Sequence, residues 1–386
     1  MVKFSVEKKA LEEAAVMLVQ VAGLKSIGAP PSESSGIYLT PTTMTLVNSN
    51  EANSVMVEDI PITVGDGDIN AHIEQAYMIN TKKFASIIKG SKVSVNFLIT
   101  ESKVAIGEGN RRFDLAIFSA PKKELPAINL FDYKVDVKEV LKNISCADLI
   151  TAQASNITEL SGTLFSADKM FASDRLSALY IEKGGLFAGA PEMEDIVVAP
   201  DLFSTCLSKT KEKEVLVGFT EDKQRVVLKF GNVTLAKGRL TSKFPKEDLL
   251  KAVLGVQTTI KKGVLKATVS LNEFVEKLHE IREIVESDEY HIKFNREGTI
   301  EIANNNLKSG TEGTVVVDAT VTMGDDLGDE IGGKFAYAHL DLFGKLFSGE
   351  DNVELHSSVG VQGTSKVLRY LAVKTDGKVF FCTPKS

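Results

Sequence analysis

Four carboxylates gather in one short stretch of the last third of the chain, where they could hold a metal cation. They are Asp325, Asp326, Asp329 and Glu330. Carboxylate oxygens are preferred ligands of Ca²⁺ and Mg²⁺, and a bound cation could support hydrolysis. Because the stretch lacks the ligand spacing of a calcium loop, we interpret it as a solvated acidic loop.

Other catalytic patterns are also weak. The segment Gly107-Glu108-Gly109-Asn110 lacks the lysine and the strand-to-helix context of a phosphate-binding loop, so it is better interpreted as a turn. No serine, histidine and aspartate surround a recognisable nucleophile turn. Four histidines stand alone, without another ligand residue at metal-binding spacing: His279, His291, His339 and His356. We therefore expect no catalytic residue, no metal site and no cofactor.

The cysteines argue against a disulfide framework, because Cys146, Cys206 and Cys382 are few, odd in number and far apart. Cys146 and Cys206 lie on apolar faces of predicted helices, so we expect them to pack in a core. No apolar run approaches the ~20 residues that span a bilayer, and the N-terminal segment becomes charged too early for a signal peptide. We expect a cytoplasmic protein without membrane contact.

The net charge of −7 taken alone argues against nucleic-acid binding, which requires clustered lysine and arginine. Net charge is a poor guide, however, when basic residues gather on one surface and acidic residues on another. The positions of the lysines in the fold therefore matter more than their number.

The elements that position these residues are organised by a repeat. Residues 290–306, YHIKFNREGTIEIANNN, alternate apolar and polar side chains on both sides of a turn, which predicts a β-hairpin. Similar hairpins are predicted at 36–50 and 162–178, so the starts lie 126 and 128 residues apart. A period of that length corresponds to a whole domain, so we expect one fold used three times.

Each third of the chain is predicted to have the order β-α-β-β-β-α-β-β-β, which is an α+β fold of helices backed by antiparallel sheets. The expected domains are residues 1–126, 127–260 and 261–386, with a linker at 121–126. The helix at 271–285 has the clearest apolar stripe of the chain. The other helices are predicted at 7–21, 80–89, 137–150, 200–209 and 338–347, and Asn80 or Thr81 is expected to cap the second of them.

Several segments, in this order and at this spacing, resemble the bacterial-type sliding clamp, the DNA polymerase III beta subunit. They are KFSVEKKAL at the start, FASDRLSALY and KGRLTSKFPKE in the middle third, and IKFNREGTIEIANNN and KVFFCTPKS in the last. The resemblance covers the whole chain and includes its triplication. It suggests a divergent or phage-encoded member.

The resemblance implies a homodimer in which three clamp domains per chain close head to tail into a ring around double-stranded DNA, without sequence specificity. In that family the two helices of every domain line the central hole. Basic residues on or beside the corresponding elements are Lys25, Lys82, Lys83, Lys89, Lys138, Lys142, Lys209, Lys277, Arg282 and Lys345. The alternative is that these lysines simply solvate helix faces, as on any surface helix. The acidic Asp201 stands where the family has basic residues.

The family also has a pocket in which the replicative DNA polymerase and the clamp loader insert a short peptide. Its Thr-Asp-Gly-His-Arg-Leu segment is represented here, two residues shorter, by Ser173, Asp174, Arg175 and Leu176. The other matching positions are Pro245, Leu249, Leu250, Phe381, Cys382, Thr383 and Pro384. The apolar residues that normally end the chain are missing, which leaves the preferred peptide undefined.

By the same resemblance, Phe113, Leu115, Ile284 and Val285 match apolar contacts across the dimer interface. The alternative is that all four belong to intradomain cores. Ile284 favours the interface, because it falls off the buried stripe of its helix.

Three hypotheses follow. The first is a non-catalytic processivity clamp whose partners are DNA, the replicative polymerase, the clamp loader and a second copy of itself. The second is a structural or interaction protein that forms rings without DNA. The third, least favoured, is a metal-dependent hydrolase that uses the acidic loop.

Overall fold

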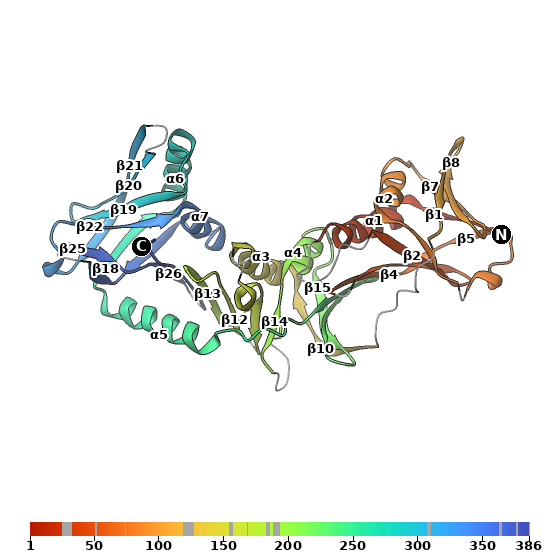
Figure 1. The fold of residues 1–386 in the computed structure, drawn as a ribbon, viewed down its shortest axis with the longest axis horizontal. Coiled ribbons are helices and arrows are strands. Elements are labelled where there is room, and N and C mark those ends of the chain that lie inside the picture. Colours follow the sequence, from red (N-terminus) through yellow and green to blue (C-terminus); the bar gives the residue numbers. More distant parts are fainter. Residues whose placement is uncertain are drawn as a thin grey trace. The chain divides into compact units, whose positions relative to one another are not determined.

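The computed structural model describes residues 1–24, 33–50, 52–73, 75–118, 127–153, 157–167, 169–182, 186–187, 194–306, 310–362, 365–375 and 377–385. Contacts divide the chain into two compact units. Unit 1 comprises Met1–Ile144 and Val198–Leu240, and unit 2 comprises Ser145–Val197 and Thr241–Ser386. Both units combine helices with antiparallel sheets (Figure 1), which confirms the predicted α+β class.

Unit 1 contains two antiparallel sheets, with strand orders β5-β1-β7-β8-β9 and β10-β15-β16-β17-β4-β3-β2-β6. The strands of the smaller sheet are β1 (Val2–Glu7), β5 (Thr63–Gly67), β7 (Ser94–Ile99), β8 (Lys103–Glu108) and β9 (Arg111–Ala116). Those of the larger sheet are β2 (Ser34–Leu39), β3 (Thr43–Ser49), β4 (Asn53–Pro61), β6 (Tyr77–Asn80), β10 (Ile128–Asp136), β15 (Glu214–Thr220), β16 (Arg225–Phe230) and β17 (Val233–Gly238).

The helices of unit 1 bury one apolar face each. They are α1 (Lys8–Gly23), α2 (Thr81–Lys89), α4 (Asp201–Leu207) and the first part of α3 (Val137–Gln153). The buried residues of α1 include Leu11, Ala14, Leu18 and Ala22, which recur at helical spacing. At α2 the cap is Asn80, whose side chain accepts a hydrogen bond from the Lys83 N–H at 2.9 Å. Along this helix the 3.6-residue period leaves Lys82, Lys83 and Lys89 exposed and buries Phe84 and Ile88.

Unit 2 is built on a long antiparallel sheet of order β14-β11-β12-β13-β27-β26-β23-β18-β21-β20-β19-β22, with a separate hairpin β24-β25. Its strands are β11 (Thr163–Ser166), β12 (Lys169–Ser173), β13 (Ser177–Glu182), β14 (Ile196–Val198), β18 (Leu265–Ser270), β19 (Glu289–Asn295), β20 (Thr299–Asn306), β21 (Thr311–Met323), β22 (Glu330–Ala336), β23 (Asn352–Ser357), β24 (Val359–Gln362), β25 (Ser365–Leu368), β26 (Leu371–Thr375) and β27 (Lys378–Cys382). The predicted hairpin at 290–306 is β19 and β20.

Helices α6 (Leu271–Val285) and α7 (Tyr337–Leu346) pack together in unit 2. The bounds of α6 are those predicted, and its side chains Leu271, Phe274, Leu278, Ile281 and Val285 are buried. Ser270 caps this helix by accepting a hydrogen bond from the Glu273 N–H.

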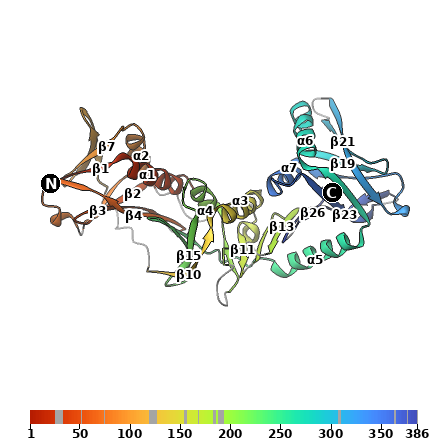
Figure 2. The same ribbon diagram turned by 180° about the vertical axis from the view of Figure 1, so that it is seen from behind.

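The prediction missed one helix. Residues 246–262, for which no element was predicted, form α5 (Lys246–Lys262), which ends at Gly263 in the left-handed conformation. Val253 and Val256 are its buried residues, and it contacts β23. Figures 1 and 2 both place α5 on the side of unit 2 away from α6 and α7.

Other predicted boundaries also need correction. Each third has more strands before its second helix than the predicted order contains, namely β2 to β6, β11 to β14 and β19 to β22. Both α1 and α3 extend further than expected, and the proposed linker at 121–126 lies outside the described residues.

Two strand pairings join neighbouring thirds of the chain. In unit 1, β4 pairs with β17, the last strand of the middle third. In unit 2, β13 pairs with β27, the last strand of the final third. These pairings cross the predicted boundaries between thirds, and the three-domain division stays a prediction.

In the part of the chain that the structure describes, each helix is too short or too polar to cross a lipid bilayer.

Candidate functional site

Two of the predicted basic residues of unit 1 line a groove between α1 and α2. The groove has a volume of about 460 Å³. Its floor is formed by small and apolar side chains, among them Ala15, Val16, Val19, Ala85 and Ile88. Lys82 and Lys89 lie at its rim with Glu12 and Gln20. The groove therefore offers two cations beside one carboxylate.

Six of the predicted basic residues of unit 1 are exposed and have no ion-pair partner among the described residues. Among the described residues, no carboxylate forms an ion pair with any of six lysines: Lys82, Lys83, Lys89, Lys138, Lys142 and Lys209. The predicted Lys25 lies outside the described residues. Asp201, which stands where a basic residue was expected, pairs at 2.6 Å with the buried Nζ of Lys237. Asp201 therefore balances a core cation.

The predicted basic residues of unit 2 are compensated by neighbouring carboxylates. Lys277 lies 2.7 Å from Glu280, and Lys345 lies 2.5 Å from Asp341. Arg282 lies 3.2 Å from Asp288, and its guanidinium stacks over the Tyr337 ring. The two sets of predicted cations therefore differ in the charge that they present to an anion.

The turn between β12 and β13 is held by one buried aspartate. Oδ1 of Asp174 accepts hydrogen bonds from the Leu176 and Ser177 N–H groups at 3.0 and 2.6 Å, and from the Ser177 hydroxyl. Arg175 has φ of 79°, a left-handed conformation that is uncommon for a residue with a side chain. The aspartate bonds hold the backbone in that conformation, which leaves Arg175 and Leu176 exposed.

The end of the chain runs beside this turn. The Thr383 N–H and hydroxyl both donate to the Leu176 carbonyl, at 2.7 and 3.1 Å. Cys382 is buried opposite Ser177, and Phe381 pairs with Ala178. Pro384 lies against Gly333, and the Lys385 N–H donates to the Lys334 carbonyl. The turn residues 173–176 and the segment 381–384 therefore form one surface.

The third predicted part of this site lies at the start of α5. Lys246 pairs with Asp195 at 2.7 Å and donates to the Ser166 hydroxyl, so this end of the helix is held beside β11. Pro245, Leu249 and Leu250 are half-buried there. Since β12 separates β11 from β13 in the sheet, the structure brings the turn and the chain end together and leaves this group two strands away.

His339 on α7 was not predicted to lie at this site. Its Nε2 lies 2.7 Å from Oδ2 of Asp174, although the two residues are 165 positions apart in sequence. Burial by itself would raise the pKa of Asp174, but the hydrogen bonds from His339 and Ser177 outweigh it and hold this pKa below its ordinary value. A lone histidine in a helix carries no local signal of such a partner.

The four residues predicted at the dimer interface fall into two groups. Phe113 on β9 and Ile284 on α6 are 41% and 61% exposed. Leu115 and Val285 are buried within the chain, at 6% and 1% exposure. Leu115 and Val285 therefore contribute to cores, whereas Phe113 and Ile284 are available to another chain.

The acidic loop contains a short 3-10 helix, Asp325–Leu327, and its Glu330 begins β22. Lys366 pairs with Asp326, and Lys293 pairs with Glu330 at 3.2 Å. Within the described residues, no three potential ligand residues cluster in a way that could hold a metal ion.

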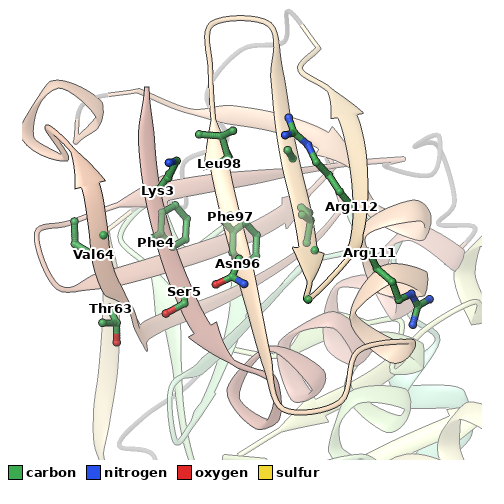
Figure 3. Close-up of a pocket in the computed structure, with 15 residues that line it drawn as sticks. Lys3, Phe4, Ser5, Thr63, Val64, Asn96, Phe97, Leu98, Arg111 and Arg112 are labelled. Atoms are coloured by element: carbon green, nitrogen blue, oxygen red, sulfur yellow. The ribbon is translucent and has the colours of Figure 1, made fainter.

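A further pocket of about 370 Å³ lies on the five-stranded sheet of unit 1 (Figure 3). Phe4 and Phe97 stack side by side on neighbouring strands, and Arg112 borders the pocket from β9. Two of its flanking cations are paired with carboxylates, Lys3 with Asp66 and Arg112 with Asp114, and Arg111 donates a hydrogen bond to the Gly90 carbonyl. Gly109 belongs to the two-residue turn between β8 and β9, so the glycine-rich segment there is a hairpin, as predicted.

Solved structures with the same fold cover essentially the whole chain. The DNA polymerase III beta subunit of Thermotoga maritima is 14% identical, with a TM-score of 0.78 and 100% of both chains covered. The DNA polymerase sliding clamp of Bacillus subtilis is 14% identical, with a TM-score of 0.78, covering 100% of this chain and 99% of that one. The DNA polymerase III subunit beta of Pseudomonas aeruginosa is 14% identical, with a TM-score of 0.76 and 99% coverage of both.

No family model matches the chain, and no curated protein sequence matches it. At such identities the likeness establishes the fold and leaves the function to be argued from the chain's own residues.

Proposed function

We propose that this chain, which has the fold of the beta-subunit sliding clamps over its full length, is a non-catalytic processivity factor for a DNA polymerase. Two copies form a closed ring around duplex DNA, and the turn at 173–176 captures a peptide of the polymerase or of the clamp loader. The full-length likeness in fold is the observation that carries this proposal.

Ring closure is supported by β9 and β21. Among the described residues, each lacks a neighbouring strand that its equivalents in the other two thirds have. The last strands of the second and third thirds, β17 and β27, are covered by β4 and β13 and are almost entirely buried. Their equivalent in the first third, β9, ends its sheet and buries only Leu115. The equivalent of β4 and β13 in the last third is β21. Its residues 311–318 pair with β20 on one side. On the other side, no strand among the described residues pairs with them. An exposed edge favours addition of a strand from another chain.

The proposed dimer therefore pairs β9 of one copy with β21 of the other, which is a heterologous contact that closes after two copies. We take the β17–β4 pairing as the template for its register. Val233, the first residue after the turn, lies opposite Val57, which lies opposite Leu46 on its other side, just as Val315 lies opposite Ile302. Applied to β9, this template places Arg111 opposite Val315 and Phe113 opposite Gly313.

Cysteine cross-linking tests this register. On the other face of the ladder, Arg112 would lie opposite Thr314, so an Arg112→Cys, Thr314→Cys protein should oxidise readily to a covalent dimer. Pairing Arg112→Cys with Asp318→Cys gives a control four residues out of register, which should cross-link poorly. The native cysteines are buried, and burial raises the pKa of Cys206 to about 12, which keeps its background reaction low. Equal cross-linking of both pairs would refute the register.

The uncompensated lysines of unit 1 support DNA as the occupant of the ring. Attraction between these lysines and phosphates needs no base contacts, so it suits a ring that slides. The compensated cations of unit 2 contribute less, and we propose that DNA is held mainly by the helices of unit 1.

Retention on circular DNA tests the function. Protein incubated with linear duplex, which is then ligated into a circle, should remain with the DNA through gel filtration and should be lost after a restriction cut. Equal loss from both forms would contradict a sliding clamp. A ring that assembles yet shows no retention on circles would instead support a structural protein that forms rings without DNA.

A further inference from the structure

The surface around the turn at 173–176 depends on a hydrogen bond between two buried side chains that are far apart in sequence. Asp174 and His339 are 9% and 3% exposed, and their side chains meet at 2.7 Å. Asp174 belongs to the turn itself, whereas His339 is the third residue of α7. The pair therefore ties an exposed loop to a helix of the core.

The two carboxylate oxygens of Asp174 have different hydrogen-bond partners. Oδ1 accepts all three bonds that shape the turn, from the Leu176 and Ser177 backbone N–H groups and the Ser177 hydroxyl. Oδ2 is left to His339. A buried carboxylate without a partner for its second oxygen is strongly disfavoured, so removal of the histidine would favour movement of Asp174 toward water. The turn bonds would be lost with it.

Stability alone does not explain a histidine at this position. The Nδ1 atom of His339 is buried and has no hydrogen-bond partner among the described residues. An unsatisfied buried polar atom is unfavourable in either protonation state of the ring, and an apolar side chain at the same place would avoid that cost. In our account, the hydrogen bond that orients Asp174 offsets the free-energy cost of the unsatisfied Nδ1 atom.

We propose that His339 is the positioning residue of the partner site: through Asp174 it holds the turn in the one conformation that exposes Leu176 beside Thr383. The partner segment is a short peptide with an apolar side chain to place against Leu176. This inference rests on the proposed function only in assigning the turn to partner binding.

Hydrogen exchange of the turn amides tests it without DNA or partner. The His339→Leu variant keeps an apolar side chain of similar bulk and removes the donor, whereas His339→Gln restores a donor at similar reach. In the full-length protein, we expect protection of the Leu176 and Ser177 amides to fall at least tenfold in His339→Leu and to recover to within about threefold of wild type in His339→Gln.

The matched control is His356, another buried histidine, which lies beside the carboxylate of Glu354. The Nδ1 atom of His356 also lacks a hydrogen-bond partner among the described residues. His356→Leu should leave the turn amides protected. Unchanged protection in His339→Leu would overturn the proposal. So would a loss that His339→Gln does not restore, or an equal loss in His356→Leu. Because these outcomes do not depend on a ring or on DNA, they can fail while the clamp function holds.

Discussion

The predicted basic residues differ in their immediate surroundings, and this difference should be measurable. Lys82 and Lys89 border the α1–α2 groove without an ion-pair partner among the described residues, whereas Lys277 and Lys345 are paired with Glu280 and Asp341. A lysine that is already paired with a carboxylate neutralises a phosphate less completely. Its contact with DNA therefore releases fewer counterions from the DNA. Residue type alone could not reveal this, because the carboxylates that pair with Lys277 and Lys345 are identified only by the fold.

The Lys82→Ala, Lys89→Ala protein should bind duplex DNA more weakly and with less salt dependence. If each lysine contacts one phosphate, the slope of log affinity against log salt falls by about 2. The Lys277→Ala, Lys345→Ala protein has the same change in net charge and should lose less than half of that slope. Fluorescence anisotropy across a salt series measures both. Equal losses would show that the compensating carboxylates do not matter.

Asp174 should make the stability of unit 2 depend on acid. Its pKa is lowered in the folded protein, so its contribution is fully present above the ordinary aspartate pKa and is lost as pH falls through the lower folded value. At pH 7, Asp174→Asn should reduce the free energy of unfolding by about 2–4 kcal/mol. The difference from wild type should shrink below about pH 4 in urea titrations. A difference that stays constant with pH would contradict this account.

Among the elements, α6 and α5 mark the limits of what the sequence could predict. The stripe of α6 repeats cleanly and begins after a capping serine, so its bounds followed from local pattern. In α5 the apolar residues 249, 253, 256 and 260 do recur at helical spacing, but Leu250 and Leu254 lie off that stripe and Leu254 is 52% exposed, so the pattern is less clear than in α6. The prediction assigned three residues at and near its start to a pocket, and the helix was missed. Similarly, β4–β17 and β13–β27 join distant segments that no local pattern connects.

The packing of α5 can be tested with neighbouring residues. Val253 is 1% exposed, so Val253→Ala should reduce the free energy of unfolding by on the order of 1–3 kcal/mol. Leu254→Ala, one position away and facing solvent, should change it by less than about 0.5 kcal/mol. Denaturant unfolding of both variants makes the comparison. A larger effect at Leu254 would mean that another surface covers that face.

The proposed edge strands make a prediction for the ring interface. Phe113→Glu on β9 and Ile284→Glu on α6 each place a charge where the account expects an apolar contact between copies. Either substitution should weaken the dimer on the order of 100-fold and leave the fold intact, because both side chains are exposed within the chain. Val361→Glu, at a 72% exposed position on β24, is the matched control and should remain dimeric. Sedimentation velocity distinguishes the outcomes.

For the whole molecule, the repeat predicted an α+β fold used three times, and the resemblance of several segments to sliding clamps predicted the clamp fold. The full-length likeness to solved clamps confirms that fold. Which residues act on which partner could not be predicted as well. The sequence placed Leu115 and Val285 with Phe113 and Ile284, but burial separates the two pairs. It also gave no sign of His339, because the partner of that residue lies 165 positions away.

The central claim is that two copies enclose DNA, and a covalently closed ring tests it most directly. The Arg112→Cys, Thr314→Cys protein is incubated with linear duplex, the DNA is ligated into a circle, and the cysteines are oxidised before denaturation in detergent. A topological link survives denaturation, so the account predicts protein that migrates with the circle and is released by a restriction cut. Oxidised dimers that separate from intact circles in detergent would contradict the claim.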